Sequence, residues 1–187
     1  VLTKGIDIVL TLDVSGSMKS MDFEPNNRLD SAKEVVAGFI KGRKNDRIGM
    51  VIFHAHSFTQ CPITTDYGVL LQLLDAVQIG RIEDGTAIGM AIANSVKRLK
   101  DRESKSKIII LLTDGVNNTG KIDPITAANL AKTMGVKIYT IGIGREGRVP
   151  FPVHDPVFGR RTIIVETKLD EELLIKIAEI TDGVYFR

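Results

Sequence analysis

The sequence predicts an α/β fold: a doubly wound, mostly parallel six-stranded sheet with one antiparallel edge strand and helices on both faces. Three observations lead to this prediction. Apolar, β-branched runs alternate with amphipathic segments of helical period along the chain. Two runs, 6–12 and 107–113, are apolar almost throughout, as in strands covered on both faces. Two others, 47–54 and 57–63, are separated by a very short connection, which predicts a hairpin with an antiparallel edge strand.

The first strand, 6–12, ends abruptly in a polar cluster. Asp13, Ser15, Gly16 and Ser17 follow its last apolar residue. In open α/β sheets, ligands bind at the carboxyl ends of the strands. The first strand therefore delivers three oxygen-bearing side chains to the edge of the sheet where a ligand is expected.

Helices connect the first strand to the rest of the sheet. Apolar residues recur at helical spacing over 29–41, which predicts an amphipathic helix that returns the chain to the hairpin. Asp66 is placed to cap a second helix over 67–77. A third helix is predicted over 87–100, with basic residues in its last turn that complement the helix dipole.

The second half of the chain repeats the strand-then-acid pattern. The strand 107–113 ends in Asp114, and Asp123 with Pro124 marks the start of a fourth helix. Residues 144–161 hold three prolines and are predicted to be a long loop of the functional or mobile kind. The fourth helix is predicted to end at 134, and a strand is predicted at 137–143. Asp170 is predicted to open a final helix over 170–180, which a strand at 183–186 follows.

Composition narrows the class of protein. A chain of 187 residues with 43% hydrophobic content can bury one substantial core, so a single domain is predicted over 1–187. The net charge of +2 argues against a nucleic-acid-binding domain. Cys61 is the only cysteine, which excludes an intramolecular disulfide. The longest apolar run, 108–112, is too short to cross a bilayer, so this segment is expected to be soluble and without direct membrane contact.

Five oxygen-bearing side chains are expected to meet at one point. Asp13, Ser15 and Ser17 follow the first strand, Asp114 follows another buried strand, and Thr86 precedes the third helix. If the two strands are neighbours where the strand order reverses, both acids face the ligand crevice. Two carboxylates balance a divalent cation and hydroxyls add neutral oxygens, a donor set that suits Mg²⁺ or Mn²⁺ better than zinc. An exchangeable position would accept a carboxylate from a partner protein.

Three motifs together resemble the metal-ion-dependent adhesion site of von Willebrand factor A (VWA) domains. They are Asp13-Val14-Ser15-Gly16-Ser17, Asp84-Gly85-Thr86 and Thr113-Asp114-Gly115, in this order. The resemblance covers about residues 6–187 and implies a Rossmann-like VWA fold. It also implies that Mg²⁺ is held, partly through water, by the five residues Asp13, Ser15, Ser17, Thr86 and Asp114, with a partner Asp or Glu completing the shell. Asp84 is interpreted as an acid that shapes its loop rather than as a ligand.

The closing stretch LLIKIAEITDGVYF, after a proline-rich loop, resembles bacterial VWA proteins of the aerotolerance (Bat) type. That resemblance implies a domain excised from a longer protein that is anchored by transmembrane helices. It places the VWA domain at the extracytoplasmic face of a bacterial membrane. The function expected from both resemblances is metal-dependent protein–protein interaction, as an adhesion or scaffold module without catalysis.

Two alternative functions remain open from the sequence. One is a structural VWA scaffold whose metal only steadies its loops. The other is a Mg²⁺-dependent phosphohydrolase with Asp13 as nucleophile. Against this enzyme, Ser15 stands where the haloacid-dehalogenase pattern has a second Asp, and the motif loops hold no histidine base.

Other motifs are weaker. The GxGxxG pattern at 142–147 lacks the helix that a pyrophosphate site requires, because prolines follow it. His54 and His56 lack a nearby third zinc ligand. The glycosylation triplet at 117–119 is interpreted as chance. A cluster of arginines in or beside the long loop suggests electrostatic steering of an acidic partner: Arg145, Arg148, Arg160 and Arg161.

Overall fold

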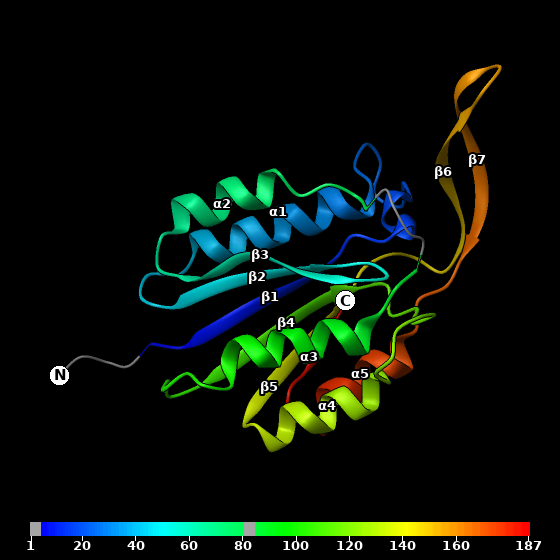
Figure 1. Cartoon of the computed structure of the whole chain (residues 1–187). Helices are drawn as coiled ribbons and strands as arrows, with labels where there is room; N and C mark the ends of the chain where they lie inside the picture. Colours follow the sequence, from blue (N-terminus) through cyan, green and yellow to red (C-terminus); the bar gives the residue numbers. More distant parts are fainter. Residues whose placement is uncertain (1–4, 81–84) are drawn as a thin grey trace.

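A six-stranded sheet with the strand order β3-β2-β1-β4-β5-β8 forms the centre of the molecule (Figure 1). The computed structural model describes residues 5–80 and 85–187. Neighbouring strands of this sheet are parallel except β2 and β3, which confirms the predicted fold class. The strands are β1 (Asp7–Asp13), β2 (Arg47–Phe53), β3 (Ser57–Thr64), β4 (Lys107–Thr113), β5 (Val136–Gly142) and β8 (Tyr185–Phe186).

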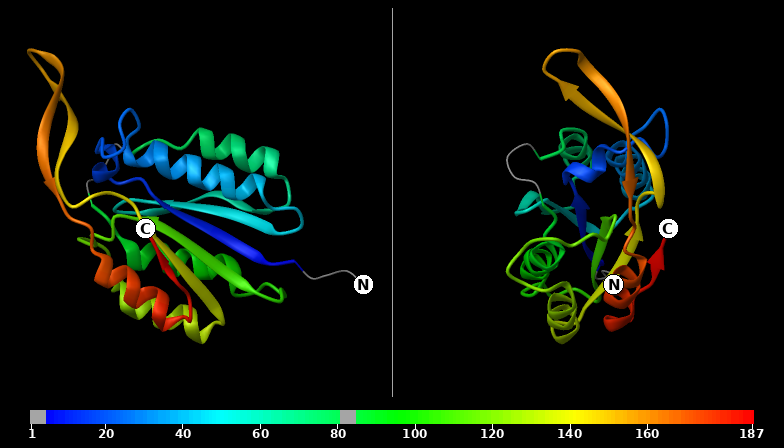
Figure 2. Two further views of the ribbon diagram at one scale, coloured as in Figure 1. Left: turned by 180° about the vertical axis from the view of Figure 1, so that it is seen from behind. Right: turned by 90° about the vertical axis from the view of Figure 1, so that its right-hand side faces the viewer.

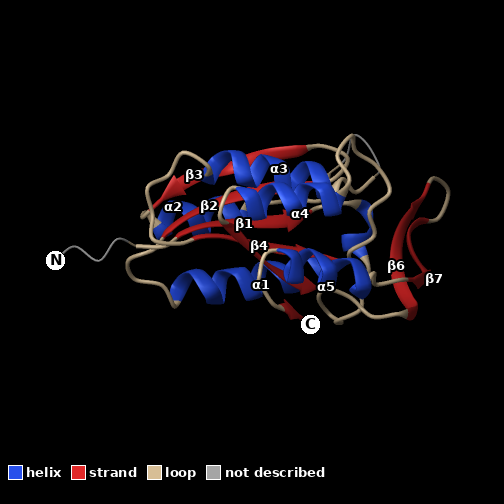
Figure 3. Cartoon of the chain, turned by 90° about the horizontal axis from the view of Figure 1, so that it is seen from below, coloured by secondary structure: helices blue, strands red, loops and turns tan. Residues whose placement is uncertain are grey.

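Helices cover both faces of the sheet (Figures 1 and 3). Two of them pack against each other on one face, and the other three lie on the opposite face. The first face is covered by α1 (Arg28–Lys41) and α2 (Tyr67–Asp75), and the second by α3 (Ile88–Leu99), α4 (Pro124–Thr133) and α5 (Glu171–Ile180). Each helix begins and ends within about two residues of the predicted range.

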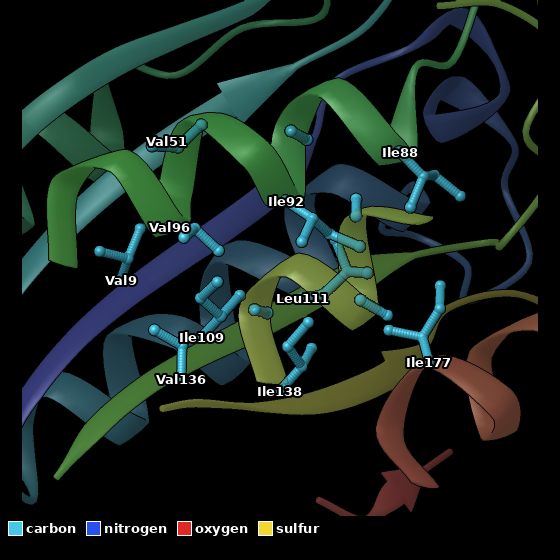
Figure 4. Close-up of a cluster of buried hydrophobic side chains, with 14 of the residues drawn as sticks. Val9, Val51, Ile88, Ile92, Val96, Ile109, Leu111, Val136, Ile138 and Ile177 are labelled. Carbon is cyan, nitrogen blue, oxygen red and sulfur yellow. The ribbon is translucent and has the colours of Figure 1, made fainter. Parts of the chain in front are cut away.

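The core is divided by the sheet into two hydrophobic clusters. All seven residues of β1 are buried, as the near-continuous apolar run predicts for a central strand. Val9 belongs to the cluster beneath α3, α4 and α5, which Figure 4 shows in close-up, whereas Leu10 belongs to the cluster beneath α1 and α2. Side chains of successive strand residues point to opposite faces, so β1 holds both layers together.

The strand order reverses at β1. The chain proceeds from β1 to β2 on one side and reaches β4 on the other side, with Leu12 in register with Leu112. This register brings the carboxyl ends of β1 and β4 together. Consequently Thr113, the last residue of β4, donates a hydrogen bond from its hydroxyl to Asp13 Oδ2 at 2.6 Å. The prediction that β1 and β4 are neighbours at the point where the strand order reverses is therefore confirmed.

The prediction of a long loop over 144–161 is wrong. The chain instead forms an antiparallel hairpin of β6 (Gly147–Asp155) and β7 (Gly159–Thr167), separate from the main sheet. Figure 2 shows this hairpin projecting from the α/β body. Pro150 and Pro152 do not break β6, because they occupy alternate positions on an edge where an N–H is not needed for pairing with β7.

Side-chain caps start three of the helices as predicted. Asp66, Asp123 and Asp170 each accept a hydrogen bond from the backbone N–H three residues later. Asp84, interpreted from the sequence as an acid that shapes its loop, lies outside the described residues. Within residues 5–80 and 85–187, the helices are too short or too polar to span a bilayer.

Candidate metal centre

The loop after β1 turns two serine hydroxyls toward each other. Asp13 Oδ1 accepts a hydrogen bond from the backbone N–H of Ser15 at 2.8 Å, which tightens the turn as the strand ends. A short 3₁₀ helix, η1 (Gly16–Lys19), follows at once. The hydroxyl oxygens of Ser15 and Ser17 lie 3.1 Å apart, so this turn presents two neutral oxygens side by side.

Thr86 is held in place by a loop far away in the sequence. Its backbone N–H donates to Asn118 Oδ1 at 2.8 Å, and its carbonyl accepts from the Asn118 N–H at 3.1 Å. Asn117 Oδ1 accepts from the N–H of Ile88 at 2.9 Å, which satisfies one of the free donors at the start of α3. Within the triplet at 117–119, interpreted from the sequence as a chance glycosylation motif, Asn118 therefore positions Thr86 and Asn117 satisfies a donor of α3.

Asp114 is buried at the end of β4 and its two oxygens have separate partners. Oδ1 accepts from the N–H of Val116 at 3.2 Å, and Oδ2 accepts from Arg28 Nη1 at 3.2 Å. Gly115, with φ of 78°, follows at once, and a Cβ there would lie 2.7 Å from the carbonyl oxygen of Asp170. The turn that aims Asp114 thus depends on this glycine.

Arg28 is a buried cation that the sequence analysis missed. Its side chain is 1% exposed, and it donates from Nε and Nη2 to the two oxygens of Asp22 at 2.9 and 2.8 Å, in addition to its bond to Asp114. Gly144 backs the guanidinium so closely that a Cβ there would lie 2.6 Å from Arg28 Cζ. The only local signal was a cation in the first turn of a helix, where the helix dipole disfavours it.

Asp13 is the most electrostatically perturbed group of the site. Burial, and after it the repulsion from the nearby Asp114 carboxylate, raise its pKa from the usual 3.8 to about 7. Hydrogen bonds from Ser15 and Thr113 act in the opposite direction but are outweighed. Two carboxylates held close together in a buried site repel each other, and a divalent cation would relieve this repulsion. The donor set therefore fits a hard divalent metal ion.

Four of the five predicted site residues line one pocket of about 750 Å³. Asp13 is fully buried and is not part of the pocket wall, because its oxygens are turned toward Ser15 and Thr113. The root of β7 contributes Glu166, Thr167 and the adjoining Lys168 to the same pocket. The four predicted residues that line it are Ser15, Ser17, Thr86 and Asp114.

His54 and His56 lie in the turn between β2 and β3, and the GxGxxG stretch joins β5 to β6. The ring centroids of His54 and His56 lie 6.1 Å apart, and the described part of the chain holds no group of three His, Cys, Asp or Glu side chains suited to a metal ion. In the GxGxxG stretch, Gly142 ends β5 and Gly147 begins β6, so no helix N-terminus follows these glycines. Cys61 is buried, and burial raises the pKa of its thiol.

Fold and pocket together define an α/β domain of Rossmann-like architecture with a polar, hydroxyl-rich crevice at the switch point of its sheet. The model of the von Willebrand factor type A domain matches residues 7–187, and the chain belongs to this family.

Relatives agree with this assignment. An uncharacterized protein of Borreliella burgdorferi is 37% identical over 99% of this chain and 54% of its own length. The crystal structure of an aerotolerance-related membrane protein from Bacteroides fragilis is 32% identical, with a TM-score of 0.86, and covers 98% of this chain and 91% of that chain. Proximal thread matrix protein 1 from the mussel byssus, solved with a zinc-occupied MIDAS motif, is 25% identical with a TM-score of 0.72 over 97% of this chain and 41% of that chain. The chain spans about half the length of the curated relatives it matches.

Proposed function

We propose that residues 1–187 form a single VWA domain that binds Mg²⁺ or Mn²⁺ and uses the bound ion to recognise a protein partner. The metal ligands in this proposal are Asp13, Ser15, Ser17, Thr86 and Asp114. An Asp or Glu of the partner completes the metal shell by displacing a water molecule. The domain acts as an adhesion or scaffold module and performs no catalysis.

The observation that carries this proposal is the convergence of four of these side chains on one pocket. They come from three loops, after β1, before α3 and after β4, and are separated by up to about a hundred residues in the sequence. The pocket is open to solvent and large enough to admit a partner's side chain as well as an ion. Asp13 lies beneath the pocket wall, so in this proposal it binds the ion through an intervening water molecule.

Charge supports a divalent cation with an open coordination position. Asp13, Asp114 and Asp22 carry three negative charges when ionised, and Arg28 carries one positive charge, so a divalent ion would neutralise the set. The hydroxyls of Ser15, Ser17 and Thr86 add no charge, which leaves the metal electrophilic toward a partner's carboxylate. The zinc-occupied site of the mussel protein supports divalent-metal binding as a property of such pockets.

A purely structural metal is less well supported. The loops of the pocket are already tied together by protein groups, since Arg28 bonds to Asp114, Asn118 to Thr86, and Thr113 to Asp13. The metal is therefore not needed to close these loops, and its value lies in what it presents to solvent. The likeness to an aerotolerance-related membrane protein supports a further part of the proposal, that the domain belongs to a membrane-anchored protein and lies at the extracytoplasmic face of a bacterial membrane.

Calorimetric titration of the purified domain with Mg²⁺ and Mn²⁺ tests the metal site. Asp114→Ala and Ser15→Ala are expected to abolish saturable binding, whereas the matched control Asp101→Ala, which changes an exposed carboxylate, is expected to leave it unchanged. If Asp114→Ala and Ser15→Ala both still bind the metal saturably, the assignment of the ligands is refuted.

A second measurement separates recognition from a structural role. Pull-down from the native host is compared in Mg²⁺ and in chelator, with Asp114→Ala as the matched variant. Partners that depend on both the metal and Asp114 support the adhesion mechanism. If the metal raises the unfolding temperature but retains no partner, the structural scaffold is the better description.

A further inference from the structure

The hairpin of β6 and β7 stands apart from the main sheet. It forms a two-stranded unit of its own that projects from the α/β body (Figures 1 and 2). Val157 and Phe158 at its tip are 81% and 73% exposed, and Ile163 and Ile164, on opposite faces of β7, are 46% and 54% exposed. An isolated two-stranded ribbon is only marginally stable in water, and further strands or packing against a helix stabilise such a unit.

The outer edge of β6 is closed to further strands. The carbonyl of Pro150 accepts a hydrogen bond from the N–H of Met21 at 2.9 Å, so the backbone of Pro150 points away from β7. In an antiparallel strand every second residue points its N–H and C=O to the same side, so Pro152 shares this direction. Neither proline has an N–H to offer, and this edge therefore cannot pair with another strand.

The outer edge of β7 is open. Pro150 stands opposite Ile164, so the β7 residues whose backbone groups point outward are Arg160, Thr162, Ile164 and Glu166. None of them is proline. Figures 1 and 3 show β7 on the side of the hairpin that faces away from the α/β body, where an incoming strand has access.

We propose that β7 pairs with β7 of a second copy of this chain, antiparallel and centred on Ile163. In this register Arg160 stands opposite Glu166 of the second copy, and Thr162 stands opposite Ile164 of the second copy. All four outward-facing residues then exchange backbone hydrogen bonds across the dimer axis. Ile163 packs against its own symmetry mate, which covers an exposed apolar side chain.

Charge selects this register and this occupant. Among residues 5–80 and 85–187, Arg160 and Glu166 form no ion pair with each other or with a neighbour, although both are exposed. Within the hairpin Glu166 stands opposite Arg148, so pairing with a second copy places this acid between two cations. A shift of two residues would set Arg160 opposite Ile164 instead and lose the complementary pair.

The proposed assembly is closed. Two hairpins joined through β7 make a four-stranded sheet whose outer edges are both β6. Since Pro150 and Pro152 block these edges, no further copy can add. The interface is the same patch on both subunits, so it forms a two-fold dimer rather than an open filament.

Sedimentation velocity over about 1 µM to 1 mM protein, in chelator, tests the dimer without reference to the metal site. The wild type is expected to shift from monomer to dimer with concentration. Arg160→Glu and Glu166→Arg each set like charges opposite one another and are expected to raise the midpoint about tenfold or more. The double variant Arg160→Glu/Glu166→Arg is expected to restore the dimer, and an equal mixture of the two single variants is expected to form a mixed dimer.

A backbone variant separates strand pairing from charge. Ile164→Pro removes an outward N–H without touching the ladder between β6 and β7, as Pro150 already does on the other strand, and is expected to abolish the dimer. Ile164→Val is the matched control and is expected to retain it. Circular dichroism confirms that each variant is folded.

Three results overturn the proposal: a wild type that stays monomeric at every concentration, a dimer that survives Ile164→Pro, or a charge reversal that the double variant does not rescue. If the wild type is monomeric and binds vesicles of anionic lipid, the exposed tip at Val157 and Phe158 contacts a membrane surface instead. Because all measurements are made in chelator, failure here leaves the metal-site proposal intact and is distinguishable from its failure.

Discussion

Replacement of Arg28 by Met is expected to destabilise the protein more strongly in chelator than in saturating Mg²⁺. Arg28 makes three hydrogen bonds to carboxylates, two to Asp22 and one to Asp114, and all three residues are buried. Removing one member of a buried ion pair typically costs about 3–5 kcal/mol, because the partner charge is left without compensation. In chelator, Arg28→Met is therefore expected to lower the free energy of unfolding by about that amount.

A bound metal ion compensates part of this loss. The ion would supply a counter-charge for Asp114 but not for Asp22, so roughly one of the three bonds is replaced, worth about 1.5 kcal/mol. By linkage, the same difference must appear as an increase of about tenfold in the metal affinity of Arg28→Met. Urea unfolding followed by circular dichroism, with and without Mg²⁺, measures the first quantity, and calorimetry measures the second independently.

Two control variants sharpen this test. Arg28→Met with Asp22→Asn removes the unpaired acid and is expected to recover part of the stability lost in chelator. Arg43→Met breaks a partly exposed pair with Asp46 and is expected to cost less than about 1 kcal/mol, with no dependence on the metal. Equal destabilisation by Arg28→Met in chelator and in Mg²⁺, together with an unchanged metal affinity, would refute the argument that Arg28 competes with the metal for Asp114.

Asn118→Ala removes the acceptor for the Thr86 N–H and is expected to weaken Mg²⁺ binding several-fold in calorimetry, with the fold retained. Gly89→Ala is expected to destabilise the domain by more than about 3 kcal/mol in urea unfolding, because a Cβ there would lie 2.0 Å from a backbone carbonyl oxygen. Its matched control is Gly38→Ala, which has open space around it and is expected to stabilise α1 by about 0.5–1 kcal/mol. The folded-state pKa of Asp13, about 7, lies above the usual 3.8, so the protonated carboxyl stabilises the metal-free wild type and this stability is lost as the pH rises through about 7. Asp13→Asn has no carboxyl to ionise. The variant is therefore expected to become more stable relative to the metal-free wild type as the pH rises from about 4 to about 8.

Asn117→Ala is the matched control for Asn118→Ala, because it removes only a helix cap; equal effects of the two on metal affinity would mean that Asn118 does not position Thr86. A Gly89→Ala variant as stable as the wild type would show that the helix can move aside at little cost. If the difference in stability between Asp13→Asn and the wild type does not change with pH, the pKa of Asp13 is not raised in the folded protein.

Much of the fold and the composition of the site could be predicted from local patterns. The near-continuous apolar run of β1 identified a strand buried on both faces, and the capping positions of Asp66, Asp123 and Asp170 located three helix starts. Such patterns are readable because strand and helix periods, and the free donors at helix ends, depend only on residues close together in the chain. The acids and hydroxyls at the element ends were readable for the same reason.

What the local patterns did not contain is which loops meet. Arg28 and Asp114 are separated by 86 residues, and Thr86 and Asn118 by 32. No periodicity links such pairs, because their contact depends on strand order and register, which are set by the packing of the whole core. The turning of Asp13 away from the pocket wall also follows from this assembly, since Thr113 reaches it only across the β1–β4 pair.

The hairpin of β6 and β7 shows the same division most clearly. Its prolines indicated a loop, because proline usually interrupts secondary structure, and only the pairing of Pro150 with Ile164 shows that these prolines lie on an edge where no N–H is required. The sequence by itself determined the α/β class, the order of the elements and the chemistry available at their ends. The tertiary structure decided which charges are paired, which oxygens reach the pocket and which strand edge is open, because each of these depends on groups brought together from distant parts of the chain.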